Sequence, residues 1–171
     1  NINGTLNSDV SCSGGQDGAI VPEVTGGSQP YTFSFTGPNG YTGSLDSAIG
    51  LSAGWYYLTL TDTNQCSVVD SIEITEPTPL FISLNSLKNL SCYQAQDGWI
   101  TASISGGSGN YSISWLDVLG NSIGQTDSVF ALSAGTYTLH VVDSLGCNDS
   151  LTVTLTEPQV LSTALTSPSF V

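Results

Sequence analysis

The strongest constraint on this chain is that its sequence occurs twice. The segment Cys12-Ser-Gly-Gly-Gln-Asp-Gly18 returns 80 residues later as Cys92-Tyr-Gln-Ala-Gln-Asp-Gly98. The segment Leu51-Ser-Ala-Gly-Trp-Tyr56 returns 81 residues later as Leu132-Ser-Ala-Gly-Thr-Tyr137, because the second copy carries one inserted residue. A period of this kind indicates one small structural module used in tandem.

The repeat places the domain boundaries. Thr75-Glu-Pro77 closes the first copy and returns as Thr156-Glu-Pro158 at the end of the second. We therefore predict a first repeat over residues 1–77 and a second over 78–158. Residues 159–171 copy the start of a repeat, so we expect the first strand of a third there.

Within each copy, apolar side chains alternate with polar ones. Tyr137, Leu139 and Val141, for example, alternate with Thr138 and His140. This period of two is typical of antiparallel strands with one buried face, and Gly- and Asn-rich turns separate the runs at short intervals. Seven short strands in about 80 residues suit an Ig-like sandwich. The predicted fold is all-β, with two tandem Ig-like sandwiches arranged end to end.

Two motifs predict particular core positions of the Ig-like sandwich. Leu-Ser-Ala-Gly-x-Tyr resembles the tyrosine corner, in which the hydroxyl of Tyr56 or Tyr137 would bond the backbone just upstream. Trp115 stands where Ig domains carry their core tryptophan, and Phe35 takes that place in the first copy.

The charge balance excludes several kinds of partner. The chain has 14 acidic residues, no arginine and one lysine, Lys88, for a formal net charge of −13. Nucleic acids and anionic membranes are recognised by Lys and Arg, so neither is expected as a partner. No apolar run approaches the roughly 18 residues of a membrane span. Because the sequence also lacks methionine, we expect an internal or processed piece of a secreted protein.

No residues form a plausible catalytic group. The single histidine, His140, lies on the outward phase of its strand, and Thr59 replaces it in the first copy. Oxyanion or phosphate clamps usually need cationic or amide donors in a cleft, and the recurring acids here fall at turns. We expect no catalytic residues and no enzyme activity.

The four cysteines are expected to form disulfides in an exported protein. Cys12 and Cys66 should lie at opposite ends of one sandwich, about 17–24 Å apart at roughly 3.3 Å per residue, whereas a disulfide needs Cα atoms within about 7 Å. In tandem Ig arrays, the loop after the first strand faces the turn before the last strand of the next domain. We therefore expect Cys12 to pair with Cys147, Cys66 with a preceding copy and Cys92 with a following one. Pairing within each copy, Cys12–Cys66 and Cys92–Cys147, remains the alternative.

Acidic residues recur near the predicted border between the copies. Asp17, Glu76 and Asp143 could together supply the oxygen ligands that Ca²⁺ prefers, so we consider a junction calcium site as the one candidate cofactor. The alternative is ordinary turn chemistry, in which an aspartate accepts bonds from its own backbone.

The motif set as a whole resembles the SprB-type repeat of giant cell-surface adhesins of gliding bacteria. It runs from Cys-x4-Asp-Gly through Gly-Gly-x-x-x-Tyr, Leu-Ser-Ala-Gly-x-Tyr and Asp-x-x-x-Cys to Thr-Glu-Pro, and it covers nearly the whole chain twice. The resemblance implies export by the type IX secretion system and an extracellular, cell-surface place in a stalk or filament for adhesion and gliding motility. It also implies neighbouring repeats as partners, with any surface polysaccharide bound by another part of the protein.

Asp-Ser followed by an aliphatic residue resembles the O-glycosylation signal of the same bacterial group, and it would make this a glycoprotein. The candidate acceptors are Ser47, Ser71, Ser128, Ser144 and Ser150.

Two functions remain in competition. The first is a structural stalk repeat. The second is a carbohydrate-binding sandwich that stacks sugars on Trp55, Tyr57 and Trp99. These aromatics are not repeated in the other copy, where Thr136, Thr138 and Ala19 stand, so we favour the stalk.

Overall fold

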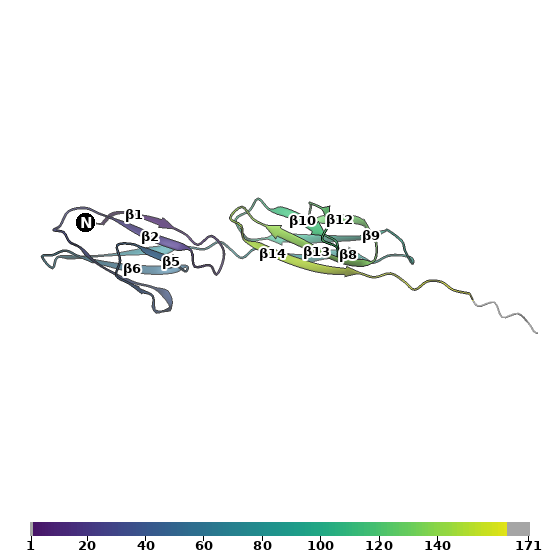
Figure 1. Cartoon of the computed structure of the whole chain (residues 1–171), viewed down its shortest axis with the longest axis horizontal. Helices are drawn as coiled ribbons and strands as arrows, with labels where there is room; N and C mark the ends of the chain where they lie inside the picture. Colours follow the sequence, from purple (N-terminus) through teal and green to yellow (C-terminus); the bar gives the residue numbers. More distant parts are fainter. Residues whose placement is uncertain (1, 164–171) are drawn as a thin grey trace, which may run out of the picture. The chain divides into compact units, whose positions relative to one another are not determined.

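The computed structural model describes the backbone of residues 2–163 and the side chains of residues 7–163. Within these residues the chain forms two compact units (Figure 1). The first comprises residues 2–80 together with two short segments from later in the chain, Gly106–Gly109 and Ser144–Cys147. The second comprises Phe81–Ser105, Asn110–Asp143 and residues 148–163.

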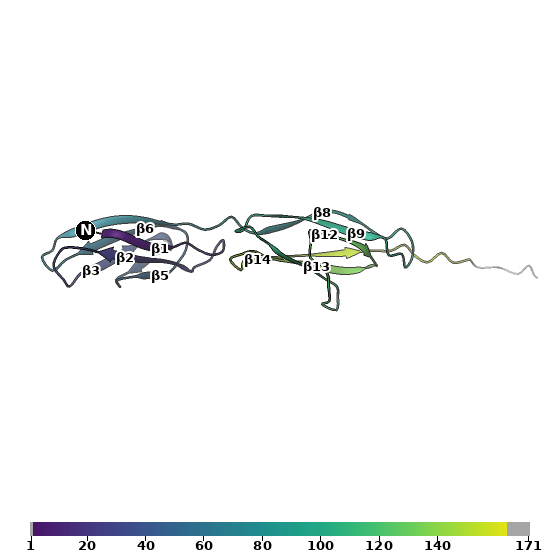
Figure 2. The same ribbon diagram turned by 90° about the horizontal axis from the view of Figure 1, so that it is seen from above.

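The first repeat folds into two antiparallel sheets (Figure 2). One sheet has the order β1–β2–β5, and the other has the order β4–β3–β6–β7. The strands are β1 (Ile2–Ser8), β2 (Gly18–Val24), β3 (Thr32–Thr36), β4 (Thr42–Gly43), β5 (Ala48–Leu51), β6 (Gly54–Thr61) and β7 (Ser67–Ile74), with one 3-10 turn, η1 (Pro38–Gly40).

The second repeat has the same topology. Its sheets are β8–β9–β12 and β11–β10–β13–β14. The strands are β8 (Phe81–Lys88), β9 (Gly98–Ser105), β10 (Ser112–Leu116), β11 (Ser122–Gly124), β12 (Ser128–Leu132), β13 (Gly135–Val142) and β14 (Asn148–Leu155). Seven strands in two antiparallel layers per repeat confirm the predicted tandem Ig-like sandwiches.

Alternation buries one face of each strand, as the sequence predicts. On β6, Tyr56 and Leu58 are buried while Trp55 and Tyr57 are exposed. The first core consists of Val10, Ile20, Phe35, Ala48, Leu51, Tyr56, Leu58, Ile72 and Ile74. Trp115 is fully buried in the second repeat, and its indole N–H donates to the Thr126 carbonyl at 3.0 Å. Phe35 is buried in the first repeat, so both predicted core aromatics are confirmed.

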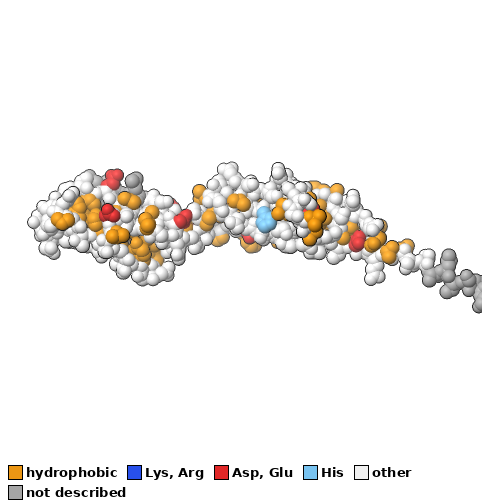
Figure 3. Space-filling view, viewed as in Figure 1, with side chains coloured by type: hydrophobic (Ala, Val, Ile, Leu, Met, Phe, Trp, Pro, Cys, Tyr) orange, Lys and Arg blue, Asp and Glu red, His pale blue; other side chains and the backbone are white. Residues whose placement is uncertain are grey.

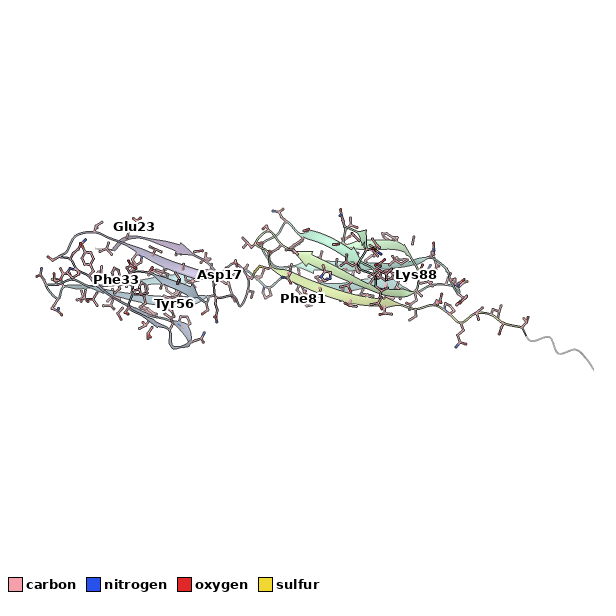
Figure 4. The ribbon with its side chains drawn as sticks, in the orientation of Figure 1. Asp17, Glu23, Phe33, Tyr56, Phe81 and Lys88 are labelled. Atoms are coloured by element: carbon pink, nitrogen blue, oxygen red, sulfur yellow. A yellow bond between two sulfur atoms is a disulfide. The ribbon has the colours of Figure 1, made fainter. Side chains whose placement is uncertain are left out.

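The tyrosine corner is present in both repeats. The Tyr56 hydroxyl donates to the Ser52 carbonyl at 2.9 Å, and the Tyr137 hydroxyl donates to the Ser133 carbonyl, also at 2.9 Å. Figure 4 shows Tyr56 directed between the two layers of its sandwich. These bonds fasten the turn before β6 and β13 to the core.

The predicted boundary after residue 77 falls in residues 75–80, which have no regular secondary structure. We call this segment the linker. Of the predicted third repeat, residues 159–163 have no regular secondary structure, and residues 164–171 lie outside the described part of the chain.

Candidate functional site

Hydrogen bonds within the loop between β1 and β2 fix its conformation. The Ser11 N–H donates to Asp17 Oδ1 at 3.0 Å, and the Ser11 hydroxyl donates to Asp17 Oδ2. These bonds, with the side-chain bond the larger cause, hold the pKa of Asp17 below its ordinary value. The Gly15 N–H donates to the Cys12 carbonyl at 2.8 Å and closes the turn that carries the cysteine. We call residues 9–17 the cysteine loop.

The linker holds the cysteine loop from outside. The Val10 N–H donates to the Thr75 carbonyl at 2.9 Å, and the Thr75 N–H donates back to Asp9 Oδ1 at 2.8 Å. Glu76 then accepts the Gly14 N–H at 2.6 Å across 62 residues of sequence. The loop that carries Cys12 is therefore positioned by the segment that leaves the first sandwich.

The second repeat builds the same arrangement. The Leu90 N–H donates to the Thr156 carbonyl at 3.0 Å, and the Thr156 N–H donates to Asn89 Oδ1 at 2.9 Å. The Gln94 N–H donates to Glu157 Oε2 at 2.7 Å. Cys92 therefore sits in a loop constructed like that of Cys12.

One addition distinguishes the second loop. Lys88 donates to Asp97 at 2.7 Å, and this charged partner is the main cause of the strongly lowered pKa of Asp97. Asp97 also accepts the Ser91 N–H at 3.1 Å, as Asp17 accepts that of Ser11.

The structure contains a disulfide between Cys12 and Cys147, the inter-repeat pair expected from the sequence. Their Cα atoms are 5.5 Å apart across a sequence separation of 135. Cys147 belongs to the turn 144–147, which lies in the first compact unit. Cys66 and Cys92 are free and exposed, so neither pairing within a copy is present.

The turn between β6 and β7 is organised by Asp62. Its Oδ1 accepts the N–H groups of Asn64 and Cys66, each at 2.9 Å, and its Oδ2 accepts the Ser28 N–H at 3.2 Å. These bonds, above all that from Cys66, lower the pKa of Asp62. The free thiol of Cys66 is thus presented on a fixed turn.

A pair of glycines receives the linker. The Gly107 N–H donates to the Thr78 carbonyl at 2.8 Å. Gly106 has φ +75°, and a Cβ at this position would lie 1.9 Å from the Pro79 carbonyl oxygen. Only glycine fits here, because a side chain would collide with backbone that cannot turn away.

The structure does not assemble the predicted calcium ligands. Asp17 is engaged by Ser11, Glu76 accepts from Gly14, and Asp143 is buried. Among residues 2–163, no group of three or more His, Cys, Asp or Glu side chains could hold a metal ion. For Asp17 the bonds are those of turn chemistry.

The glycosylation candidates fall into two settings. Ser71, Ser144 and Ser150 are exposed, whereas Ser47 and Ser128 are half-buried and donate to the preceding aspartates. Ser71 lies on β7 and Ser150 lies on β14, two positions apart when the repeats are aligned, and the N–H of each donates to the aspartate that precedes it at 2.8 Å. Three of the five sequence-predicted acceptors are therefore exposed: Ser71 and Ser150 on the last strands, and Ser144 in the turn before β14.

None of the aromatic candidates has an aromatic counterpart in the other repeat. Trp55 and Tyr57 are 50% and 53% exposed on the outer face of β6, and Trp99 is half-buried on β9. In the second repeat, Thr136 faces Thr154 at 3.0 Å and Thr138 faces Thr152 at 3.2 Å. His140 is exposed beside them. The same face is aromatic in one repeat and a threonine ladder in the other.

The surface agrees with the acidic composition. Figure 3 shows acidic side chains and no lysine or arginine on the viewed face. Between residues 2 and 163, no helix has the length and apolar character to cross a membrane.

These features define the chain as a tandem Ig-like β-sandwich protein. The SprB repeat family model matches the chain twice, at residues 7–40 and 84–120, which confirms the resemblance of both copies to SprB-type repeats. SprB repeats are elements of cell-surface adhesins.

Several solved structures are similar in fold. A C-terminal 282-residue fragment of intimin, in complex with the intimin-binding domain of its translocated receptor, is 18% identical with a TM-score of 0.49; the match covers 92% of this chain and 64% of that fragment. The amphioxus IgVJ-C2 molecule is 13% identical with a TM-score of 0.40, covering 83% and 97%. A two-domain fibronectin type III segment of chicken tenascin is 12% identical with a TM-score of 0.35, covering 89% and 97%. No curated protein shows significant sequence similarity to the chain.

Sequence reasoning missed how the cysteine loop is held. Glu76 and Glu157 were treated as part of a closing motif or as a calcium ligand, yet each caps the loop of its own repeat. Their recurrence in both copies, 81 residues apart, was the available signal. Gly106 enters the sequence analysis only as part of the Gly-Gly-x-x-x-Tyr motif, although it accommodates the linker.

Proposed function

We propose that this chain is a stalk segment of a bacterial surface adhesin, exported by type IX secretion and serving adhesion and gliding. Its task would be to transmit force from the cell to an adhesive part elsewhere in the protein. The SprB repeats and the acidic, cation-poor surface support this proposal.

The observation that carries the proposal is the Cys12–Cys147 bond. It joins residues of the two sequence repeats that are separated by 135 positions and closes the chain between them into a loop. The linker provides a second connection, seated on Gly106 and Gly107. A chain tied at two points cannot be drawn out as a simple string, which is the property that a stalk under drag requires.

Force spectroscopy on the full chain tests the mechanical part. With the disulfide intact, pulling from both termini should leave the closed segment folded or unextended. Reduction should release about 450–490 Å of additional extended length, at roughly 3.3–3.6 Å per residue. Equal extension in both states would contradict the proposal that the disulfide carries the applied force.

Surface placement needs a separate test. Fab fragments raised against the chain should label intact cells of the native host, and external protease should remove the labelling. Attachment and gliding should fall when a membrane-impermeant reductant is added. Labelling only after lysis would contradict the proposal.

A carbohydrate-binding role is the second candidate, favoured by the exposed pair Trp55 and Tyr57. Aromatic faces on a polar sheet are suited to stack against sugar rings. A glycan array on the full chain, with Trp55→Ala and Tyr57→Ala as paired variants, tests this role. Specific retention that both variants abolish would support it over a purely structural one.

Glycosylation remains a prediction. Peptide mapping of host material should find O-linked glycan on Ser47 and Ser128, the pair that recurs at the repeat offset, and on the exposed Ser71 and Ser150. Unmodified peptides covering all four would refute it.

A further inference from the structure

The first repeat carries an open hollow beside its free thiol. The hollow has a volume of about 310 Å³, and its lining includes Gly26, Gly27, Tyr31, Asp62 and Cys66. Tyr31 is fixed there, because its hydroxyl donates to the Gly26 carbonyl at 2.7 Å. We call this hollow the open acceptor.

The repeat offset identifies the counterparts of these residues. They are Gly106, Gly107, Tyr111, Asp143 and Cys147. The two glycines receive the linker at Thr78 and Pro79, and Cys147 is bonded to Cys12 of the cysteine loop. The equivalent site in the second repeat is therefore filled.

Equivalent residues of the two sites differ in how much of their surface is exposed. Asp143 is 6% exposed and Cys147 is 9% exposed. Asp62 is half-buried and Cys66 is exposed, although both sit in the same turn of the same fold. Gly26 and Gly27 are likewise exposed where Gly106 and Gly107 are half-buried. The site that meets the linker and Cys12 is the more buried of the two.

The complementary part is free in the second repeat. Cys92 carries an exposed thiol. Hydrogen bonds to Thr156 and Glu157 hold its loop, as those to Thr75 and Glu76 hold the loop of Cys12. The site in the second repeat is therefore occupied, whereas the open acceptor of the first repeat is not. The loop of Cys92 is the counterpart of the cysteine loop, and its thiol is free.

We propose that the open acceptor binds the cysteine loop and following linker of a preceding SprB repeat, and that Cys66 forms a disulfide with the loop cysteine. Cys92 offers the same loop to the next repeat. This deepens the proposed stalk function, on which it rests for the presence of further repeats. Two thiols are oxidised to one disulfide, and a small-molecule disulfide such as oxidised glutathione is reduced to two thiols.

Two single-cysteine variants of the full chain test the pairing. The Cys66→Ser chain keeps only the loop thiol, and the Cys92→Ser chain keeps only the acceptor thiol. In a glutathione redox buffer, we expect their mixture to form a covalent dimer with about tenfold more product than either variant alone, equivalent to about 1.4 kcal/mol of preference. Peptide mapping should show Cys92 linked to Cys66.

Random oxidation gives a different result. Each variant alone would then dimerise as readily as the mixture, and the mixed pair would be about half of all linked product because no partner is preferred. That distribution would overturn the proposal. It would leave surface labelling and force spectroscopy of the single chain unaffected, so failure here is distinguishable from failure of the stalk function.

A glycine pair tests whether the hollow is the docking site. Gly26 and Gly40 both have positive φ, +72° and +76°, and neither would bring a Cβ within 4 Å of a neighbour. In the Cys92→Ser background, Gly26→Ala should reduce the mixed dimer severalfold, because its Cβ would occupy the place of the incoming linker. Gly40→Ala carries the same backbone strain and should leave the yield unchanged. Equal yields for both variants would show that the thiols meet without the hollow.

Discussion

Tyr56 and Tyr57 are neighbours on β6 with opposite surroundings, so they provide a matched test of the tyrosine corner. Tyr56 is 1% exposed, and its hydroxyl donates to the Ser52 carbonyl at 2.9 Å. Tyr57 is 53% exposed on the outer face. Replacing either residue by phenylalanine removes the same single oxygen atom.

The expected cost follows from what each oxygen does. Tyr56→Phe leaves the Ser52 carbonyl without its tyrosine donor, which should lower the free energy of unfolding by about 1–2 kcal/mol. For a domain of this size, each kcal/mol shifts the melting temperature by roughly 4–8 °C. Tyr57→Phe should change stability by less than about 0.5 kcal/mol, since its hydroxyl is exposed.

Scanning calorimetry of the full chain measures both variants. Tyr137→Phe serves as a parallel in the second repeat, where the same bond to Ser133 exists. If Tyr56→Phe and Tyr57→Phe melt at the same temperature, the corner bond does not stabilise the fold and the reasoning fails.

Three further predictions concern the pH dependence, the disulfide and the linker. Burial raises the pKa of Tyr137 in the folded state. The contribution of the neutral Tyr137 to stability should therefore be complete below about pH 10 and be lost as the pH rises through the folded-state pKa. Unfolding free energies measured over an alkaline pH series should show this loss in the wild type and not in Tyr137→Phe. With the other two cysteines replaced by serine, reducing Cys12–Cys147 should lower the unfolding free energy by up to about 5 kcal/mol in the chain-entropy model, and identical urea curves with and without reductant would rule out that stabilisation. Gly106→Ala should speed proteolytic cleavage of the linker, because its Cβ would meet the Pro79 carbonyl. Gly109→Ala is the control, since Gly109 has φ +73° and a Cβ there would have no neighbour within 4 Å. Equal cleavage of the two variants would argue against the packing of the linker on Gly106.

The amino-acid sequence was sufficient for the fold because the relevant signals are local and occur twice. Alternation along β6 and β13 depends only on the period of a strand, and a one-residue slip would expose every core side chain. The tyrosine corner depends on two residues four positions apart, Tyr56 and Ser52. Trp115 and Phe35 could be placed because the repeat aligns them on the same strand.

The candidate site depends on chemistry that the sequence only partly specifies. The sequence favoured Cys12 with Cys147 over pairing within a copy, since strand length separates the two ends of a sandwich. It also grouped Asp17, Glu76 and Asp143 as calcium ligands, a grouping that the structure does not assemble. The position of acidic residues near a predicted border does not determine which N–H or O–H group donates a hydrogen bond to each carboxylate.

Only the tertiary structure decided which matching residues are covered and which are open. Gly26 and Gly106 occupy equivalent positions in the two repeats, yet only Gly106 faces the linker. Asp62 and Asp143, like Cys66 and Cys147, differ in burial although their turns are equivalent. The bond from Gly14 to Glu76 likewise joins groups 62 residues apart. The sequence determines what each strand and turn can form, because those preferences are local; which surfaces meet depends on the path of the backbone between distant residues, and that path is set only when the two sheets pack.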